Sequence, residues 1–319
     1  MENPIIIDAH SHLWLKQDTE WNGKRISPLP NGRSMFLGEE VQMCPPFMID
    51  GKNTAEVFLS NMNYAQVAGA VVTQEFIDGI QNDYYKTVNQ KYGDRLKCLY
   101  MLDYMNGEFT LPVPHEGSSL PLVGEPEGVW GGWEGVVIPG HRIYKDGKRM
   151  PINGDDFMKM FKEMEKRNLI LSLCLEDNEQ TAEFREVIEE CPNLKVAIGH
   201  FGMPTEQTWY EQVRLCQNKN VMLESGGITW LYNPEFYPYP TAMKKIRGAA
   251  DMVGIEKLMW GSDYPRTITA ITYKMSYDFV LKSDLLNDDE KRLFLGENAV
   301  RFFGFKNLTV PKRVKNMSE

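Results

Sequence analysis

Short apolar runs alternate with longer amphipathic segments along most of the chain. Eight of the apolar runs have the length and residue types of buried β-strands: residues 5–8, 69–73, 96–102, 134–138, 169–175, 195–199, 220–224 and 257–261. Helical spacing of apolar residues is found between several of them, in residues 155–167, 180–190 and 288–303. In the first of these segments the spacing places Phe157, Met160, Phe161 and Met164 on one face, which is typical of a helix that packs against a core.

Eight strands with intervening helices predict an α/β fold, namely a single-domain (β/α)8 TIM-type barrel. A doubly wound open sheet has the same alternation, but no glycine-rich phosphate loop follows any of the strands, which disfavours the dinucleotide-binding version. We expect residues 1–319 to form this one domain, with residues 305–319 as a flexible tail or as a segment that reaches a neighbouring subunit.

Three connections are too long to be simple turns. They are residues 14–52, 103–133 and 228–241, which follow the first, third and seventh predicted strands. In a barrel of this type, the loops after the strands lie on the face where active sites are built. We therefore expect the chemistry of the protein on that face.

Composition and charge narrow the class of partner. Hydrophobic residues make up 42% and charged residues 25% of the 319 residues, which is typical of a globular protein. The net charge of -9 argues against nucleic acid, and no run approaches the roughly 18 apolar residues that span a bilayer. The amino-terminal region lacks the features of a signal peptide, and the five scattered cysteines form no CxxC pair. These features predict a cytoplasmic protein with reduced thiols and a small-molecule substrate, without a membrane partner; a homo-oligomer stays an open alternative.

Two histidines end the first predicted strand, in the string DAHSH. Alternation along a strand turns the side chains of His10 and His12 to the same side. If that side is the interior of the barrel, the two imidazoles converge on one locus. Neutral imidazoles so placed suit a divalent metal, and protonated ones suit an anion.

Two further strands also end in a group that can do chemistry. His200 closes the sixth strand in VAIGHFGMP, and Asp263 follows the eighth in LMWGSDYPR. Because a closed barrel brings its last strand beside its first, we expect the Asp263 carboxylate near His10 and His12. Asp263 would ligate a metal or take a proton from an attacking water, and His200 would act on the substrate beside it.

Cationic side chains follow two of the same strands. His141 and Arg142 come after the fourth strand in VVIPGHRIY, and Arg266 comes three residues after Asp263. The planar guanidinium group offers several donors to a carboxylate or a lactone oxygen. We predict that these three side chains bind the substrate.

The strings IIIDAHSHLW, KVAIGHFGMP, LMWGSDYP and LGENAVRFFG together resemble the amidohydrolase-related ("amidohydrolase 2") family of the amidohydrolase superfamily. The resemblance extends from residue 5 to about residue 304. It implies a hydrolase on a TIM-type barrel, with His10, His12, His200 and Asp263 at the active site.

Within this family, the chain is more similar to the sugar lactonases and pyrone-dicarboxylate lactonases than to the metal-dependent decarboxylases. The decarboxylases carry a metal-binding histidine after strand five, where this chain has Cys174 and Glu176 in LILSLCLED. Gln74, after strand two, also fits the lactonase branch and is a candidate substrate contact. The resemblance implies a zinc or manganese ion held by His10, His12, His200 and Asp263 with Glu176 as a further ligand, although some lactonases of this kind work without metal.

We therefore expect a lactone hydrolase in which Asp263 activates water. Its substrate would be a lactone of a sugar acid or of a dicarboxylic acid. Two alternatives on the same scaffold are a metal-dependent decarboxylase of an aromatic or muconate-like acid and a lactone isomerase.

Overall fold

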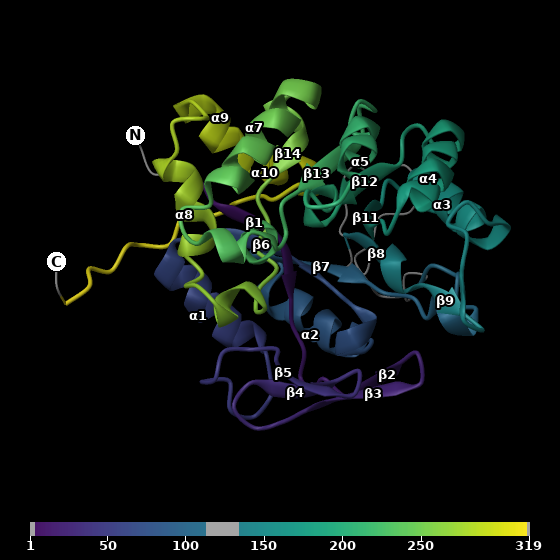
Figure 1. Ribbon diagram of the computed structural model, residues 1–319, viewed down its shortest axis with the longest axis horizontal. Coiled ribbons are helices and arrows are strands. Elements are labelled where there is room, and N and C mark those ends of the chain that lie inside the picture. Colours follow the sequence, from purple (N-terminus) through teal and green to yellow (C-terminus); the bar gives the residue numbers. More distant parts are fainter. Residues whose placement is uncertain (1–3, 113–133, 318–319) are drawn as a thin grey trace.

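A computed structural model describes residues 4–112 and 134–317, so that much of the connection expected at residues 103–133 lies outside the described residues. Eight parallel strands form one sheet, in the same order in space as in the chain (Figure 1). The strands are β1 (Ile7–His12), β6 (Gly69–Thr73), β7 (Leu96–Tyr100), β8 (Gly135–Pro139), β11 (Ile170–Cys174), β12 (Lys195–Ile198), β13 (Val221–Glu224) and β14 (Leu258–Met259). This order confirms the predicted TIM-type barrel.

Hydrogen bonds between the first strand and the residues after the last one bring the two ends of the sheet together. The Ala9 N–H donates to the Trp260 carbonyl at 2.9 Å, and the Asp263 N–H donates to the His10 carbonyl at 2.9 Å. Ser11 forms a parallel bridge with Tyr264. Because β14 itself is only two residues long, these backbone contacts, rather than a long strand pair, close the ring.

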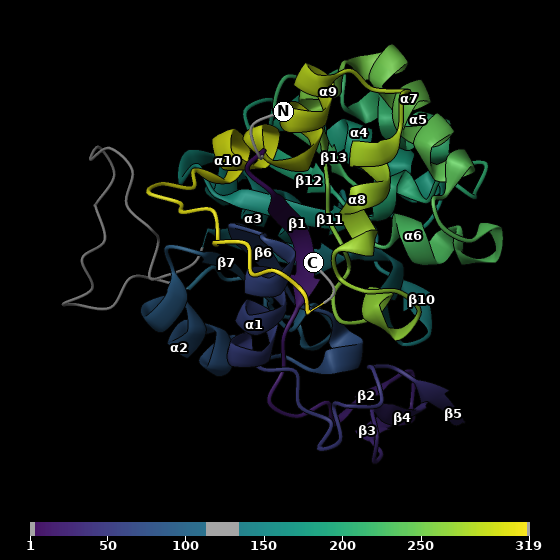
Figure 2. The same cartoon turned by 90° about the vertical axis from the view of Figure 1, so that its left-hand side faces the viewer.

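Helices cover the outside of the barrel (Figures 1 and 2). The main ones are α1 (Ala55–Ala65), α2 (Asn82–Tyr92), α3 (Asp155–Lys166), α4 (Asn178–Glu190), α5 (Trp209–Leu215), α7 (Pro240–Val253), α8 (Met275–Lys282), α9 (Asp288–Arg292) and α10 (Asn298–Phe303). The apolar face predicted for residues 155–167 is confirmed, since its four side chains are buried in α3. At the start of α4, the Asp177 carboxylate accepts a hydrogen bond from the Gln180 backbone N–H at 2.8 Å and caps the helix.

The helix expected over residues 288–303 is interrupted. A π-helical turn, Leu293–Glu297, separates α9 from α10. At Gly296 a Cβ atom would lie 2.0 Å from the carbonyl oxygen of Ile5, so only glycine lets this turn approach the beginning of the first strand. Apolar periodicity does not reveal such a bulge, because the buried positions before and after it still fit a helix.

The long connection expected after the first strand, residues 14–52, holds a small antiparallel sheet. It consists of β2 (Thr19–Trp21), β3 (Lys24–Pro28), β4 (Arg33–Phe36) and β5 (Glu39–Gln42), and it projects from the barrel in both cartoon views (Figures 1 and 2). Asn22 and Gly23, in the β2–β3 turn, both have positive φ angles, as a two-residue hairpin turn requires. This sheet was not predicted.

Two other boundaries differ from the expectation. The first strand runs from Ile7 to His12 rather than over residues 5–8, so that both histidines belong to the strand itself. The connection expected over residues 228–241 contains α6 (Ile228–Leu231) and a 3-10 turn (Asn233–Glu235), and α7 begins inside it at Pro240.

The barrel interior and the space beneath the helices form one continuous apolar core. All five cysteines are free and buried, and all but Cys174 belong to this core. Within the described ranges, no helix combines the length and the apolar character that a membrane crossing needs.

Candidate active site

Strand β1 delivers two imidazoles to the carboxyl end of the barrel. His10 and His12 are both buried, and their Nε2 atoms lie 3.1 Å apart. The pairing of β1 with β6 shifts its register between Asp8 and Ser11, within the same stretch. The alternation predicted from the sequence therefore brings the two rings to one point.

Asp263 reaches the same point from the other end of the barrel sequence. Its Oδ1 atom lies 3.0 Å from His12 Nε2 and 3.8 Å from His10 Nε2. Burial raises the pKa of the Asp263 carboxyl, but His12 and Arg266 more than offset burial and hold the pKa well below its usual range. The carboxylate is therefore ionised at neutral pH. Its backbone φ of 60° is unusual for an aspartate and aims the side chain into the barrel mouth.

His200 lies beside the pair. Its ring centroid is 4.9 Å from that of His10, and its Nδ1 atom is 3.0 Å from the Gly226 carbonyl oxygen. Because a carbonyl oxygen only accepts, Nδ1 carries the proton and Nε2 is left with a free lone pair. Burial, followed by the repulsion of His10, lowers the pKa of His200 to about 4. His200 is thus a neutral acceptor in the site.

The turn that carries His200 has an uncommon backbone. Four successive residues from His200 to Met203 have φ angles between 51° and 63°, and only Gly202 among them is a glycine. Left-handed conformations cost free energy for residues that have a Cβ atom, and they concentrate at functional sites. The turn bends the chain sharply after β12 and leaves the His200 ring at the mouth of the barrel.

A buried carboxylate that the sequence analysis did not single out supports this group. Glu224, the last residue of β13, is 1% exposed, and its Oε1 atom lies 2.7 Å from His10 Nδ1. Burial by itself lowers the pKa of His10, but the Glu224 carboxylate outweighs burial and the pKa rises to about 9. With its Nδ1 proton donated to Glu224, His10 keeps a fixed orientation.

The cationic side chains predicted to bind substrate are all tied to buried acids. Arg142 Nε lies 3.2 Å from Glu75 Oε1, and His141 Nε2 lies 3.4 Å from the other oxygen of the same carboxylate. Arg266 holds both oxygens of Asp78, at 2.7 and 2.8 Å. Both arginines therefore form ion pairs with carboxylates of the protein.

Two other candidate residues lie outside this arrangement. The Gln74 amide donates to Asn82 and to the Leu99 carbonyl, and it accepts from the Gln81 N–H, so it serves the scaffold around β6 and α2. Glu176 is exposed and accepts a hydrogen bond from the Tyr144 hydroxyl. Neither residue belongs to the cluster of His10, His12 and Asp263.

The group fits a divalent cation. One ligand atom each from His10, His12 and Asp263 lies within 4.8 Å of the others, and all three residues are buried. Two imidazole nitrogens and a carboxylate oxygen are a donor set that zinc and other borderline metals accept, with room for water or substrate.

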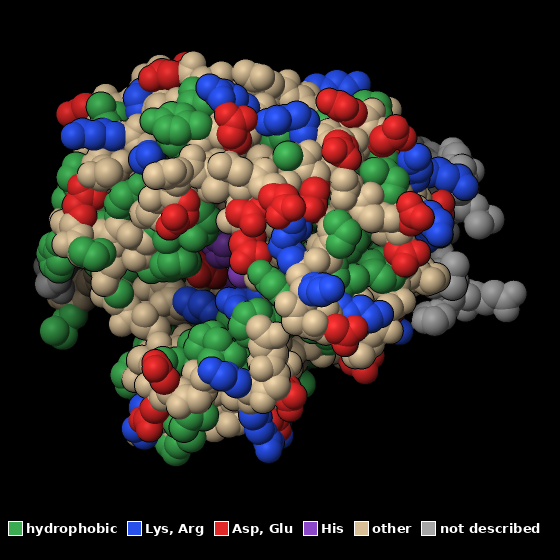
Figure 3. Space-filling view, turned by 45° about the vertical axis from the view of Figure 1, so that its right-hand side comes forward, with side chains coloured by type: hydrophobic (Ala, Val, Ile, Leu, Met, Phe, Trp, Pro, Cys, Tyr) green, Lys and Arg blue, Asp and Glu red, His purple; other side chains and the backbone are tan. Residues whose placement is uncertain are grey.

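The surface has a hollow in which histidine side chains are visible (Figure 3). Figure 3 shows histidine side chains at the base of a hollow, with acidic side chains along one side and basic ones along the other. A small molecule in this hollow would therefore contact histidine, acidic and basic side chains (Figure 3).

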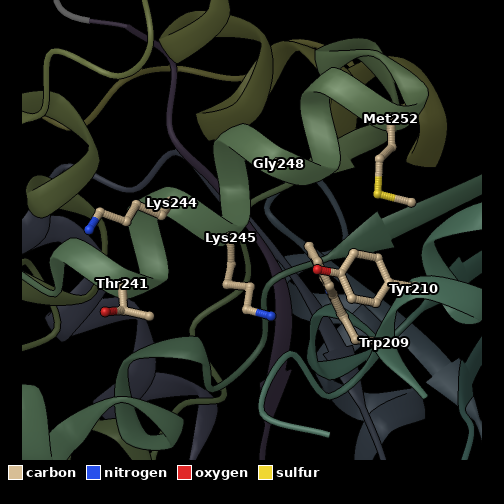
Figure 4. A pocket seen from close by; sticks show the side chains of 7 residues that line it. All are labelled: Trp209, Tyr210, Thr241, Lys244, Lys245, Gly248 and Met252. Atoms are coloured by element: carbon tan, nitrogen blue, oxygen red, sulfur yellow. The ribbon is translucent and has the colours of Figure 1, made fainter. Parts of the chain in front are cut away.

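Another hollow lies away from the site, between α5 and α7. Its volume is about 320 Å³, and its lining residues are labelled in Figure 4. The Lys245 ammonium lies 4.1 Å from the centre of the Trp209 ring, so a cation of the protein already covers this aromatic wall.

A family model described as "Amidohydrolase" matches residues 135–305, more than half of the chain. The protein is an amidohydrolase. The match includes the strand ends that carry His200, Glu224 and Asp263. The resemblance stated from the sequence is thereby confirmed, and with it an enzyme of the amidohydrolase superfamily. A search of curated proteins finds no sequence match.

Solved structures share the fold of this amidohydrolase at low sequence identity. A probable 2-pyrone-4,6-dicarboxylic acid hydrolase from Acinetobacter baumannii, with citric acid bound, is 20% identical with a TM-score of 0.66, over 94% of this chain and 99% of that one. An amidohydrolase from Burkholderia multivorans with bound zinc is 15% identical with a TM-score of 0.67, over the same shares. A 2,6-dihydroxybenzoate decarboxylase complexed with 2,6-dihydroxybenzoate is 12% identical with a TM-score of 0.56, over 79% of this chain and 89% of that one.

Two residues of the amidohydrolase site escaped sequence reasoning. Glu224 ends a predicted strand as His200 does, so a polar residue at the end of an apolar run was a usable signal. Trp230, whose Nε1–H donates to Asp263 Oδ2 at 2.7 Å, looked like one aromatic residue among several in its loop. Nothing in the sequence pattern marks that contact.

Proposed function

We propose that this amidohydrolase opens lactones by hydrolysis, with Asp263 as the group that takes the proton from water. The observation that carries the proposal is the convergence of an ionised, buried carboxylate with His10 and His12 at the carboxyl end of the barrel. An ionised carboxylate has no proton to donate and can accept one, which is the protonation state that a general base needs.

The residues divide the work as follows. Water, deprotonated by Asp263, attacks the carbonyl carbon, and the ring C–O bond then breaks. The proton held by Asp263 passes to the departing alkoxide, which gives a hydroxy acid. Neutral His200 presents Nε2 as an acceptor, so it is suited to orient the attacking water or a substrate hydroxyl group.

His10, His12 and Asp263 are the residues that would hold a divalent metal, zinc or manganese. When bound, such an ion would polarise the carbonyl oxygen and lower the pKa of water. Glu224 contributes by fixing the orientation of the His10 ring.

The charges at the rim favour an uncharged lactone ring of the sugar type over a dicarboxylate. Arg142 and Arg266 already neutralise Glu75 and Asp78, at distances of 3.2 Å or less. A substrate with two negative charges needs cationic side chains that are not already paired with carboxylates of the protein. His141, which shares Glu75 with Arg142, would contact polar groups of the lactone.

The test is a panel of sugar lactones and of pyrone dicarboxylates, followed by mass spectrometry of the products. We expect product masses increased by one water from the sugar lactones. Asp263→Asn should lower kcat about 100- to 10,000-fold, which is the usual contribution of a general base. The matched control is Asp251→Asn, at an exposed position on α7, and it should leave turnover unchanged.

Two results would contradict the proposal. Loss of carbon dioxide from an aromatic acid, with no lactone opened, would assign the site to decarboxylation. Near-normal turnover by Asp263→Asn would remove the role of the carboxylate. Elemental analysis of the purified protein determines independently whether zinc or manganese is present.

A further inference from the structure

The indole N–H of Trp230 donates a hydrogen bond to the second oxygen of the Asp263 carboxylate. Trp230 Nε1 lies 2.7 Å from Oδ2, while Oδ1 faces the two imidazoles of β1. The Trp230 ring also lies edge-on to His200, with 6.0 Å between the ring centroids. Trp230 is 37% exposed, so one edge of the indole contacts the Asp263 carboxylate while another part of the residue faces solvent.

The backbone before Trp230 is shaped for this contact. Gly227 has a φ of 73°, and a Cβ atom at this residue would lie 2.0 Å from Trp230 Nε1. A Cβ atom at Gly226 would lie 2.8 Å from His10 Cγ. Two successive glycines thus let the turn after β13 lie against His10 and let the indole fold back onto Asp263.

We propose that Trp230 is a positioning residue of the reaction, which holds Asp263 so that only Oδ1 is presented to the His10 and His12 side. This inference rests on the proposed role of Asp263 as the base. A carboxylate is free to rotate about its Cβ–Cγ bond and to offer either or both oxygens. The indole N–H donor removes that freedom, because turning the carboxylate would break a charge-assisted, partly buried hydrogen bond.

Orientation matters for this chemistry because proton transfer requires the accepting oxygen to lie within hydrogen-bond reach of the water. With Oδ2 anchored, Oδ1 stays 3.0 Å from His12 Nε2. It also matters for a metal, since an anchored Oδ2 leaves Asp263 as a ligand through one oxygen. Loss of the indole N–H would allow the carboxylate to bind a cation through both.

The kinetic test compares two variants that break the contact in different ways. Trp230→Phe keeps an aromatic ring but lacks the N–H donor, and Gly227→Ala displaces the indole with its N–H intact. We expect both to lower kcat for the preferred lactone by roughly 10- to 100-fold with KM nearly unchanged, as is usual for residues that orient a reactive group. Trp209→Phe is the matched control, because Trp209 lies on α5 and its Nε1 has no partner among the described residues.

Unchanged kcat in Trp230→Phe would overturn the proposal. A raised KM with unchanged kcat would also overturn it, since Trp230 would then be only a wall of the substrate site. If Gly227→Ala fails to fold, as judged from its melting curve, Trp230→Phe alone decides the kinetic test.

A second measurement follows Co²⁺ bound to the protein as a probe. Its visible absorption depends on the number and geometry of its ligands. We expect Trp230→Phe to weaken the absorption as the second carboxylate oxygen joins, whereas Trp209→Phe leaves the spectrum unchanged. Identical spectra for the wild-type protein and Trp230→Phe would count against an anchored Oδ2.

A third measurement needs neither substrate nor metal, so it separates failure of this proposal from failure of the proposed function. Asp263→Asn removes the charged acceptor, and we expect it to change the tryptophan emission of the metal-free protein. The same substitution should have no such effect in the Trp230→Phe background. An equal change in both backgrounds would overturn the contact, whatever lactone or metal the enzyme uses.

Discussion

Replacing Glu224 by glutamine tests how the site is held together. The Glu224 carboxylate accepts three hydrogen bonds: from His10 Nδ1 at 2.7 Å, from the His200 backbone N–H at 3.2 Å and from the Gly226 backbone N–H at 2.5 Å. Glutamine has the same shape but only one acceptor oxygen. An NH2 group in place of Oε2 leaves the Gly226 N–H without a partner, and an NH2 group in place of Oε1 leaves both His10 Nδ1 and the His200 N–H without one.

The magnitude follows from burial and charge. A buried donor without a partner costs about 1–3 kcal/mol, so we expect Glu224→Gln to lower the free energy of unfolding by about 2 kcal/mol. Entropies of unfolding of roughly 2.1 cal/mol/K per residue make this a decrease of about 3 °C in the Tm of a chain of this length. Activity should fall by about 10- to 100-fold, since His10 loses its fixed orientation.

The loss of stability should also depend on pH. The pKa of His10 rises from 6.5 to about 9 in the folded protein, with Glu224 as the main favourable partner. A raised pKa stabilises the fold below the unfolded value, and this stabilisation is lost as the pH rises through the folded value. The difference in Tm between the wild-type protein and Glu224→Gln should therefore be larger at pH 6 than at pH 10.

The assay is thermal unfolding of chelator-treated protein at the two pH values, followed by circular dichroism. Glu189→Gln, at an exposed position near the end of α4, is the matched control and should melt as the wild-type protein does. An equal difference in Tm at pH 6 and pH 10 would refute the idea that Glu224 acts through its charge on His10.

Two other substitutions test the surroundings of the site. Arg142 and His141 hold the pKa of Glu75 well below its ordinary value of 4.5 against the effect of burial, so the stability from this carboxylate is present above pH 4.5 and is lost as the pH falls below it. Glu75→Gln should therefore lower the free energy of unfolding by about 2–3 kcal/mol at pH 7. In urea titrations, the difference in this free energy between the wild-type protein and the variant should become smaller only below pH 4.5. Asp177→Ala removes the cap of α4 and should cost about 1 kcal/mol in the same titrations with kcat unchanged; a lowered kcat would show that α4 is coupled to the site.

Much of the fold could be predicted from the sequence because its signals are local. Each barrel strand is an apolar run, and the barrel order follows from the alternation with helices. The small sheet β2–β5 was missed although its turns carry a signal, since Asn22-Gly23 and Asn31-Gly32 are both Asn-Gly pairs with positive φ. Its strands are short and half exposed, so they show no apolar run.

The candidate site was predictable where it depends on strand periodicity and ring closure. His10, His12 and Asp263 come together for those two reasons alone. The partners of the charged groups could not be predicted in the same way. That Arg266 pairs with Asp78, and that Trp230 reaches Asp263, depends on the path of loops whose direction is set by single glycines and left-handed residues.

The closing contacts of the barrel have a consequence for synthesis of the chain. His12 and Asp263 lie 251 positions apart in sequence, and the backbone bonds that hold them side by side involve Trp260 and Tyr264. A polypeptide still emerging from the ribosome therefore carries its imidazoles for most of translation without the carboxylate that completes them. The carboxylate joins the imidazoles only after the residues that form and follow β14 have been synthesised.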